Sequence, residues 1–374
     1  MDFGTFNIPY ALPYTEGKRT VDEVIDWDLQ LVRWADEYGL AEAYFAEHYT
    51  IGHEPSPAPD LMIAAASQRT RAIKLGAAAH LLPYHNPIAL AHRLMWLDHM
   101  CGGRYIAGFA PGSFATDAQL FGVKLADSEV FAEALDIIEA IWDREPPFRL
   151  EGKHWTVDMP EYTDYWHGPH LKPRQSPRPD VVITGLQPQS PSFQQAGRRG
   201  FSPMSQQLAG HVLCRQWDTY AAAAEEAGHT PDRASWRVLR DIFVADTDEE
   251  ARRLVIEGEA GRTWETTVLP TFKAIRSRGE RAFALAEYII DPGMEIEDLT
   301  VEWMADNFWL VGSPETVAEK VVNLDKELGG IGALLTFTYD YSENAEAYRR
   351  SFELLGTEVA PRVAAVGARE TANV

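Results

Sequence analysis

The chain has 374 residues, 45% of them hydrophobic, which is enough for one large domain or two ordinary ones. Lys and Arg total 34 and Asp and Glu total 56, so the formal net charge is −22. An acidic balance repels phosphate backbones and disfavours nucleic acid as a partner. No uninterrupted apolar run reaches the roughly 18 residues that a membrane helix needs, so no membrane partner is expected.

Cysteine usage and the N-terminal segment indicate a reducing compartment. Cys101 and Cys214 are the two cysteines, they are isolated, and no C-x-x-C pair is present. The N-terminal segment lacks the basic stretch followed by an apolar stretch that marks a secretory signal peptide. We therefore expect a cytoplasmic protein.

Strands and helices alternate through the first 145 residues. A strand at 2–8 precedes a helix whose start is marked by a capping box, Thr20 with Glu23. Further strands at 42–48, 73–83 and 104–110 alternate with helices at about 59–70, 87–100 and 127–143. The alanines of 73–83 also suit a helix, but the flanking alternation favours a strand. This alternation predicts a parallel sheet.

The alternation resumes in the second half of the chain. Strands at 180–185, 200–206, 236–245 and 332–339 are each followed by a helical pattern, which makes eight strand–helix units in total. Eight units predict an α/β fold, a (β/α)₈ TIM barrel, as a single domain over residues 1–374. The surplus forms two insertions, at about 146–179 and about 258–310, which we expect to build a pocket wall or a lid.

Polar residues gather where predicted strands end, most densely in "YFAEHYTIGHEPSPAPD" (44–60). In a TIM barrel, catalytic groups lie at the C-terminal ends of strands and in the loops that follow. His48 ends the second strand, His80 lies near the end of the third, Gly112 follows the fourth, and 187–192 follows the fifth. These residues are predicted to face the barrel mouth, with Pro55, Pro57 and Pro59 stiffening the loop after His48.

Three local patterns each allow a functional and a plain structural interpretation. Histidines 48, 53, 80 and 85 could bind a metal, but the first strand lacks the paired ligands of barrel hydrolases, so we expect no metal. The small residues of 76–79 could admit a flat ligand or simply pack. Ser190 and Pro191 suit the start of a helix, where capping is favoured over phosphate binding from this stretch alone. No GxGxxG, Walker A or GxSxG motif is present, which disfavours Rossmann, P-loop and α/β-hydrolase chemistry.

Three stretches together resemble the bacterial-luciferase-like family of flavin-dependent monooxygenases. They are "YFAEHY", "IKLGAAAHLLPYHNPIALAHRLMWLDHMCGGRYIAGFAPG" and "VGSPETVAEKV", of which the second is the most specific. The "HEPSPAPD" and "LLPYHNP" forms are most similar to limonene-monooxygenase-like members of the family.

The resemblance implies a two-component monooxygenase, expected as a homodimer. A separate flavin reductase would supply reduced FMN, which reacts with O₂ to form a flavin hydroperoxide. One oxygen atom is then inserted into a small apolar or aromatic organic substrate. Two alternatives stay open: hydride transfer with a deazaflavin coenzyme, and a non-catalytic flavin-binding partner subunit.

The resemblance also implies roles for individual residues. His48 would be catalytic, stabilising the peroxide or moving a proton. The cofactor would contact Ala78 and Ala79, joined by a cis peptide bond, together with Gly112, Gln189, Ser190 and Ser192. The substrate pocket would include Phe6, Tyr49, His80 and Phe114. Three positions depart from luciferase: Tyr49 replaces a second His, Ala110 a reactive cysteine, and Pro111 an Arg near the phosphate, for which Arg174, Arg198 and Arg199 are substitutes.

Overall fold

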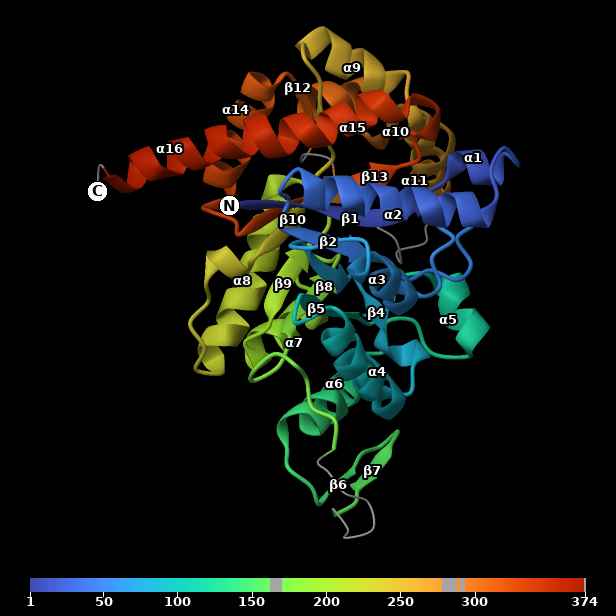
Figure 1. Ribbon diagram of the computed structural model, residues 1–374, viewed down its shortest axis with the longest axis vertical. Coiled ribbons are helices and arrows are strands. Elements are labelled where there is room, and N and C mark those ends of the chain that lie inside the picture. Colours follow the sequence, from blue (N-terminus) through green and yellow to red (C-terminus); the bar gives the residue numbers. More distant parts are fainter. Residues whose placement is uncertain (162–169, 278–287, 290–292, 373–374) are drawn as a thin grey trace.

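A closed parallel barrel organises the chain (Figure 1). The computed structural model describes residues 1–161, 170–277, 288–289 and 293–372. Nine strands follow each other around the barrel, and pairing of β3 with β5 closes it. Because β3 and β4 are successive parts of one interrupted strand that pairs with β5, the barrel has eight strand positions. This confirms the predicted (β/α)₈ fold. The strands are β1 (Asp2–Tyr10), β2 (Glu42–Phe45), β3 (Lys74–Ala77), β4 (His80–Leu81), β5 (Tyr105–Ala110), β8 (Asp180–Gly185), β9 (Ser202–Ser205), β10 (Arg237–Leu239) and β13 (Ala333–Tyr339).

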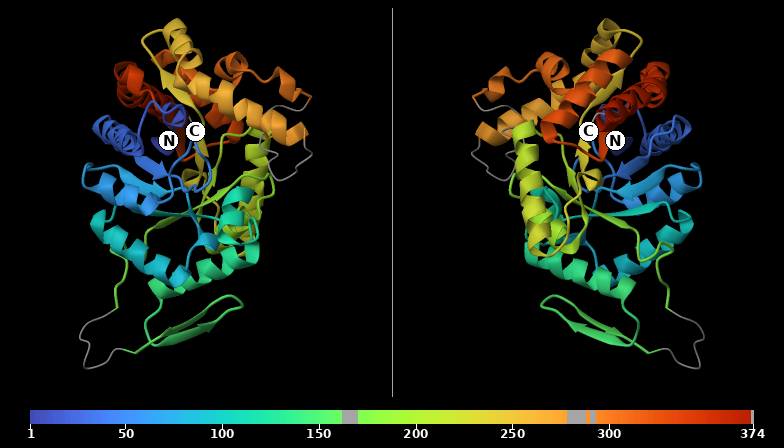
Figure 2. Two further views of the ribbon diagram at one scale, coloured as in Figure 1. Left: turned by 90° about the vertical axis from the view of Figure 1, so that its right-hand side faces the viewer. Right: turned by 90° about the vertical axis from the view of Figure 1, so that its left-hand side faces the viewer.

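Helices surround the barrel (Figure 2). Among the described residues, none of them is long and apolar enough to cross a bilayer. The predicted capping box opens α2, where the Thr20 N–H donates to Glu23 Oε2 at 2.8 Å. The helices are α1 (Leu12–Thr15), α2 (Val21–Glu37), α3 (Pro59–Ser67), α4 (Pro87–Met100), α5 (Ala115–Phe121), α6 (Ser128–Asp143), α7 (Pro191–Arg199), α8 (Gly210–Glu226), α9 (Asp248–Ile256), α10 (Glu259–Thr263), α11 (Leu269–Ser277), α13 (Val301–Trp303), α14 (Pro314–Leu328), α15 (Ala345–Leu354) and α16 (Ala360–Ala372).

Side chains fill the barrel interior and connect two non-adjacent strands through an ion pair. Glu42 of β2 and Arg237 of β10 form a buried ion pair at 2.8 Å, and the Tyr44 hydroxyl donates to the same carboxylate. A Cβ added at Gly76 would lie 2.5 Å from the Tyr44 ring, so this glycine makes room for the tyrosine. Packing therefore explains the first of the small residues in 76–79.

Two predicted strands are interrupted near the C-terminal end of the barrel. Between β3 and β4 the Ala78–Ala79 peptide bond is cis, as the family resemblance predicted. The strand predicted over 236–245 stops at Leu239, and β11 (Ile242–Val244) then pairs with β12 (Leu310–Gly312) in a separate parallel sheet. Arg240 and Asp241 lie at this break, where sequence periodicity predicted continuous strand.

The two insertions lie far apart in the molecule, the first at the bottom and the second near the top of the view in Figure 1. Residues 146–179 join the end of α6 to the start of β8 and contain the hairpin of β6 (Phe148–Glu151) and β7 (Thr156–Met159). The Gln175 amide donates to the carbonyl of Tyr105, the first residue of β5, so this insertion is at the N-terminal end. Its described residues are not a wall of the mouth, which corrects our expectation; 162–169 lie outside the described residues.

The second insertion covers the C-terminal end. Its α10 begins close to the end of β13, and the Trp264 indole N–H donates to the Tyr339 hydroxyl at 3.0 Å. Arg262 forms an ion pair at 2.7 Å with Glu16, in the connection that follows β1. This placement agrees with a pocket wall, although residues 278–287 and 290–292 lie outside the described part.

Candidate active site

His48 is held at the mouth by the loop that follows β2. Its backbone N–H donates to the Ser56 carbonyl at 2.8 Å, and the Ser56 hydroxyl donates back to the Ala46 carbonyl at 2.8 Å. The proline-rich segment therefore folds back onto the strand end. The His48 ring meets the Phe114 ring edge-on, with centroids 4.9 Å apart.

Two carboxylates flank the His48 imidazole. Nε2 lies 3.3 Å from Glu54 Oε2, and Nδ1 lies 3.8 Å from Asp117 Oδ2, a distance at which the interaction is electrostatic. Burial alone would lower the pKa of His48, but Glu54, Asp117 and Glu47 outweigh it and raise the pKa above its usual value. The arrangement favours an imidazole that holds a proton near neutral pH.

Asp117 connects the His48 loop to α5. Its side chain is fully buried and accepts the Thr50 N–H at 2.8 Å as well as the Thr50 hydroxyl. Burial would raise the pKa of Asp117, but its contacts with His48 and Thr50 lower it, so the group stays ionised. Sequence analysis missed this residue because nothing in the chain marks a contact between positions 48 and 117.

Glu47, next to His48, is the centre of a separate buried network. Its carboxylate accepts hydrogen bonds from the Leu81 N–H at 2.8 Å and from the Tyr49 hydroxyl. His85 Nε2 lies 2.8 Å from the same carboxylate. Glu47, His80 and His85 offer ligand atoms within 4.8 Å of one another, the one such grouping among the described residues. Because the Glu47 oxygens are already occupied by hydrogen bonds, we interpret this group as a structural network that fixes the β2 and β4 ends.

A small apolar surface lies beside His48 on the neighbouring strands. Ala79, Leu81 and Ala110 cluster at the ends of β4 and β5, with Tyr84 packed against them. Gly112 has φ +88°, and a Cβ there would lie 2.7 Å from the Tyr84 hydroxyl oxygen. Alanine and glycine at these positions keep the surface low enough for a flat ring to approach.

The start of α7 lies at the same end of the barrel. Ser190 and Ser192 are buried, their hydroxyls are 2.7 Å apart, and the Ser192 hydroxyl donates to the Thr184 carbonyl at 2.8 Å. The Ser190 hydroxyl does not cap the helix, contrary to the capping interpretation, and Gln189 beside it is exposed. Unpaired amides at a helix start attract phosphate groups.

The three arginines considered for a phosphate contact are placed elsewhere. Arg198 and Arg199 end α7, and Arg199 pairs with Asp136 and Glu139 of α6. The Arg174 side chain lies by Gly103, at the start of β5. None of the three lies at the α7 start, because Arg198 and Arg199 are at the other end of α7 and Arg174 is at the start of β5.

The four residues expected in the substrate pocket have different surroundings. Phe6 faces the barrel interior, with its ring edge-on to Phe337 at 5.2 Å. Tyr49 packs on Phe121 at 4.7 Å, to the side of His48. The His80 ring is fully buried against Tyr105 and Phe109 on the helix-facing side of the barrel, where burial lowers its pKa to about 3. His80 therefore does not line the mouth, which corrects the expectation drawn from its position near the end of the third strand and from the family resemblance.

A second polar group lies across the mouth from β2, at the break after β10. The Tyr339 hydroxyl donates to Asp241 Oδ1 at 2.8 Å. Burial raises the pKa of Asp241 to about 7, although Tyr339, Gln207 and Arg240 each oppose the rise. An aromatic wall joins the two groups, since Tyr10 stacks on both His53 and Tyr339. Sequence analysis missed Asp241 because it treated 236–245 as one strand.

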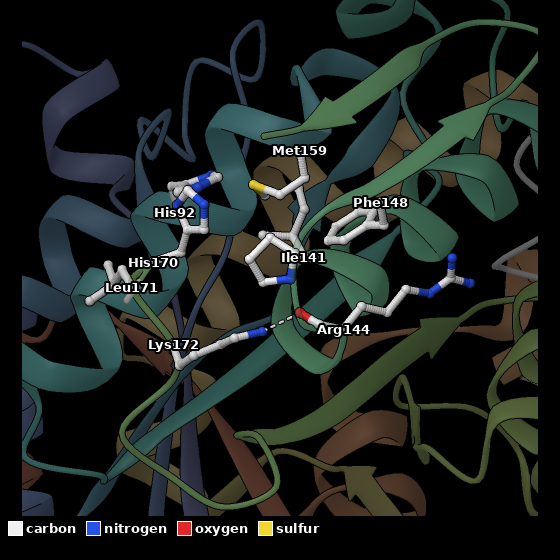
Figure 3. Close-up of a pocket in the computed structure, with 9 residues that line it drawn as sticks. His92, Ile141, Arg144, Phe148, Met159, His170, Leu171 and Lys172 are labelled. Carbon is white, nitrogen blue, oxygen red and sulfur yellow. Dashed lines mark hydrogen bonds between the residues drawn. The ribbon is translucent and has the colours of Figure 1, made fainter. Parts of the chain in front are cut away.

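A small cavity lies between α4, the end of α6 and the β6–β7 hairpin (Figure 3). Its walls include His92 of α4, Ile141 of α6, Phe148 and Met159 of the β6–β7 hairpin, and Lys172. The Lys172 ammonium donates to the Arg144 carbonyl and so ties this segment to the end of α6. The cavity belongs to the N-terminal end of the barrel and contains no residue expected in the site.

Comparison with known proteins agrees with this geometry. The profile of a family described as luciferase-like monooxygenase matches residues 1–330. The chain belongs to the luciferase-like monooxygenase family. The resemblance identified from sequence is thereby confirmed, and the protein is an enzyme of the monooxygenase class.

Relatives of this luciferase-like monooxygenase cover nearly its full length. It is 37% identical to 2,5-diketocamphane 1,2-monooxygenase 1 of Pseudomonas putida, over 97% of this chain and 99% of the relative. It is 30% identical to limonene 1,2-monooxygenase of Rhodococcus erythropolis, over 96% and 86%. It also superimposes, with a TM-score of 0.87 and 35% identity, on the oxygenating constituent of 3,6-diketocamphane monooxygenase of P. putida, a type II Baeyer-Villiger monooxygenase in complex with FMN, covering 97% and 98% of the two chains.

Proposed function

We propose that the chain is the oxygenating component of a two-component monooxygenase that uses reduced FMN. It inserts one oxygen atom of O₂ into a small apolar organic substrate, and a separate reductase supplies the flavin. The observation that carries this proposal is the full-length similarity to an FMN-binding Baeyer-Villiger oxygenating component, together with His48 and its two carboxylates at the mouth. By the same similarity, we assign a cyclic ketone as the substrate class.

The residues at the mouth fit FMN. Ala78 and Ala79, with Ala110 nearby, would lie against the ring, and Gly112 leaves space beside Tyr84. The start of α7, with Gln189, Ser190 and Ser192, would hold the phosphate through backbone amides and hydroxyl groups. Bound reduced FMN supplies the electrons that activate O₂. Glu54 and Asp117 raise the pKa of His48, so the imidazole would hold a proton at the mouth and could act there as a proton donor or acceptor.

An anaerobic titration followed by a product assay tests the proposal. We expect the protein to bind reduced FMN more tightly than oxidised FMN, because the reduced form is delivered by the reductase. Exposure to air with a bicyclic ketone present should yield a lactone, detected by mass spectrometry, whereas slow coenzyme oxidation in air would favour a deazaflavin enzyme. Binding of neither flavin form would contradict a two-component monooxygenase.

An exposed apolar flank supports the expected homodimer. Leu61 of α3 is 69% exposed, Trp96 and Met100 of α4 are 63% and 41% exposed, and Val21 and Ile25 of α2 are also exposed. The helices α2, α3 and α4 are neighbours (Figure 1). Exposed patches of this kind commonly mark association sites.

The oligomeric state can be measured directly. Trp96→Glu should shift the protein from dimer to monomer in light scattering. Leu120→Glu is the matched control, because Leu120 is 61% exposed but lies on α5, outside the flank. A monomeric wild-type protein would remove the dimer from the proposal. We further propose a cytoplasmic location, which is supported by the free thiols of Cys101 and Cys214.

A further inference from the structure

An internal cavity lies at the C-terminal end of the barrel, where β11 separates from β13. Its lining includes Asp241, Ile242, Ala260, Trp309, Phe337 and Tyr339. Two of these side chains carry a buried polar atom with no hydrogen-bond partner in the described part of the chain, Asp241 Oδ2 and Trp309 Nε1. Buried polar atoms are nearly always paired, so two unpaired atoms in one cavity call for an explanation.

The two unpaired atoms have complementary chemistry. The Trp309 indole N–H can only donate a hydrogen bond, while a protonated Asp241 carboxyl donates through Oδ2 and an ionised one only accepts. Asp241 Oδ1 is already used by the Tyr339 hydroxyl, so Oδ2 is the free position. A carbonyl oxygen has two lone pairs and can accept from both donors at once.

The rest of the cavity is apolar, and both polar side chains are fixed. Asp241 is 6% exposed and Trp309 is 1% exposed, and the Trp309 ring packs edge-on against Trp264 at 5.5 Å. Trp264 in turn donates to the Tyr339 hydroxyl that holds Asp241. The second insertion therefore supplies one donor and positions the other.

We infer that Asp241 and Trp309 form a subsite for the carbonyl oxygen of the substrate, with the apolar body directed toward the mouth. This inference rests on the proposed ketone-oxygenating function. It makes Asp241 and Trp309 specificity-determining residues: the protonated carboxyl and the indole N–H favour a ketone over a hydrocarbon of the same shape.

The protonation state of Asp241 then controls ketone binding. The titratable and charged groups around Asp241 are Arg240 on its own segment, Tyr10 on β1, Tyr339 on β13, and Tyr341 and Tyr348 beyond it. Burial raises the pKa of each of these tyrosines and lowers that of Arg240 only to about 10. Asp241, with a pKa of about 7, is the one member of the group that changes charge between pH 6 and pH 8.

The test is calorimetric titration of the FMN-loaded protein, without reductant, with camphor and with borneol. Camphor carries a ketone, and borneol carries a hydroxyl that can donate to an ionised carboxylate. We expect the camphor dissociation constant to rise about tenfold between pH 6 and pH 8, because only the protonated form binds the ketone. Borneol binding should not weaken over the same range.

Three variants separate this effect from other titrations, including that of His48. Asp241→Asn should bind camphor with no pH dependence, because an amide keeps a donor but does not titrate. Trp309→Phe should weaken camphor binding about three- to tenfold at pH 6 through loss of one hydrogen bond. Asp28→Asn is the matched control, because Asp28 is also a buried carboxyl with a raised pKa but lies on α2, and the wild-type profile should persist.

Two results would overturn the inference. One is camphor binding that is independent of pH in the wild-type protein, and the other is an unchanged pH profile in Asp241→Asn; in either case the cavity holds internal water only. A failure of the proposed function can be distinguished from a failure of this inference. Absence of lactone despite pH-dependent camphor binding contradicts the oxygenation, whereas lactone formation with pH-independent binding contradicts the subsite alone.

Discussion

The two insertions are both rich in aromatic residues, yet only one of them meets the mouth. Residues 146–179 connect helix α6 to strand β8, whereas residues 258–310 lie within the long connection from strand β10 to α14, the helix that leads to β13. In a parallel barrel, connections from helix to strand cross the N-terminal end and connections from strand to helix cross the C-terminal end. The place of an insertion in the strand–helix order therefore matters more for function than its composition.

The two insertions also differ in how many of their buried polar atoms lack a hydrogen-bond partner. In the described part of the second insertion, three buried side-chain atoms have no hydrogen-bond partner: Glu259 Oε2, Thr263 Oγ1 and Trp309 Nε1. The described part of the first insertion contributes none, and its hairpin is held by surface pairs such as Arg149 with Asp158 at 2.8 Å. Each unpaired buried group calls for a partner such as a ligand or a water molecule, whereas the ion pairs of the first insertion lie on the surface.

The largest expected effect is on product yield, and it is expected for a histidine at the mouth but not for one in the distant cavity. His48→Ala should lower product yield about 10²- to 10⁴-fold, since it removes the proton-holding group at the mouth. Flavin oxidation should continue, with hydrogen peroxide replacing product. His92→Ala, in the cavity of Figure 3, is the control and should leave product yield unchanged. Equal yields from both variants would show that His48 is structural.

Substituting one tryptophan in each insertion tests how far each insertion contributes to stability and to substrate binding. Trp264 is 1% exposed and hydrogen-bonded to Tyr339, so Trp264→Ala should lower the free energy of unfolding by about 3–5 kcal/mol and raise the KM for ketone. Trp155 in the first insertion is only partly buried, so Trp155→Ala should cost less and leave KM unchanged. Urea unfolding and steady-state kinetics measure both. A changed KM in Trp155→Ala would mean that the first insertion reaches the substrate.

Limited proteolysis compares the insertions in the unmodified protein. Flavin with ketone should slow cleavage between residues 258 and 310, because this segment packs over the mouth. Cleavage between 146 and 179 should proceed at the same rate with and without ligands. The sequence of this insertion also predicts an exposed segment, "RSRGERAF" (276–283), which lies largely outside the described residues. Ligand protection of the first insertion instead would reverse the comparison.

An effect on stability alone is expected from a buried carboxyl away from the mouth. Burial raises the pKa of Asp28 to about 8, so between the ordinary carboxyl pKa and pH 8 the folded protein binds one more proton than the unfolded chain. Stability should therefore fall as pH rises through this range, by about 1 kcal/mol per pH unit from this group. Asp28→Asn should flatten the dependence in thermal unfolding measured at pH 5 to 8. An unchanged slope would show that Asp28 does not titrate in this way.

The sequence was sufficient to predict the barrel because each strand and helix carries its own local signal. Apolar runs, the Thr20–Glu23 box and the prolines that start helices all act within a few residues. His48 was predicted for the same reason, since it directly follows a strand. Asp117 and Asp241 were not, because their roles depend on contacts across 69 residues of chain and on a strand break that periodicity does not reveal. His80 was placed at the mouth because it lies near a strand end, but the sequence does not show which side of the barrel a residue at that point faces.

The most direct test of the account is a crystal structure of the protein with FMN. We predict the isoalloxazine ring against Ala78 and Ala79 at the C-terminal mouth, within reach of His48, and the phosphate at the start of α7 beside Ser190. Flavin bound at the opposite end, in the cavity lined by His92 and Lys172, would contradict the assignment of the mouth as the active site.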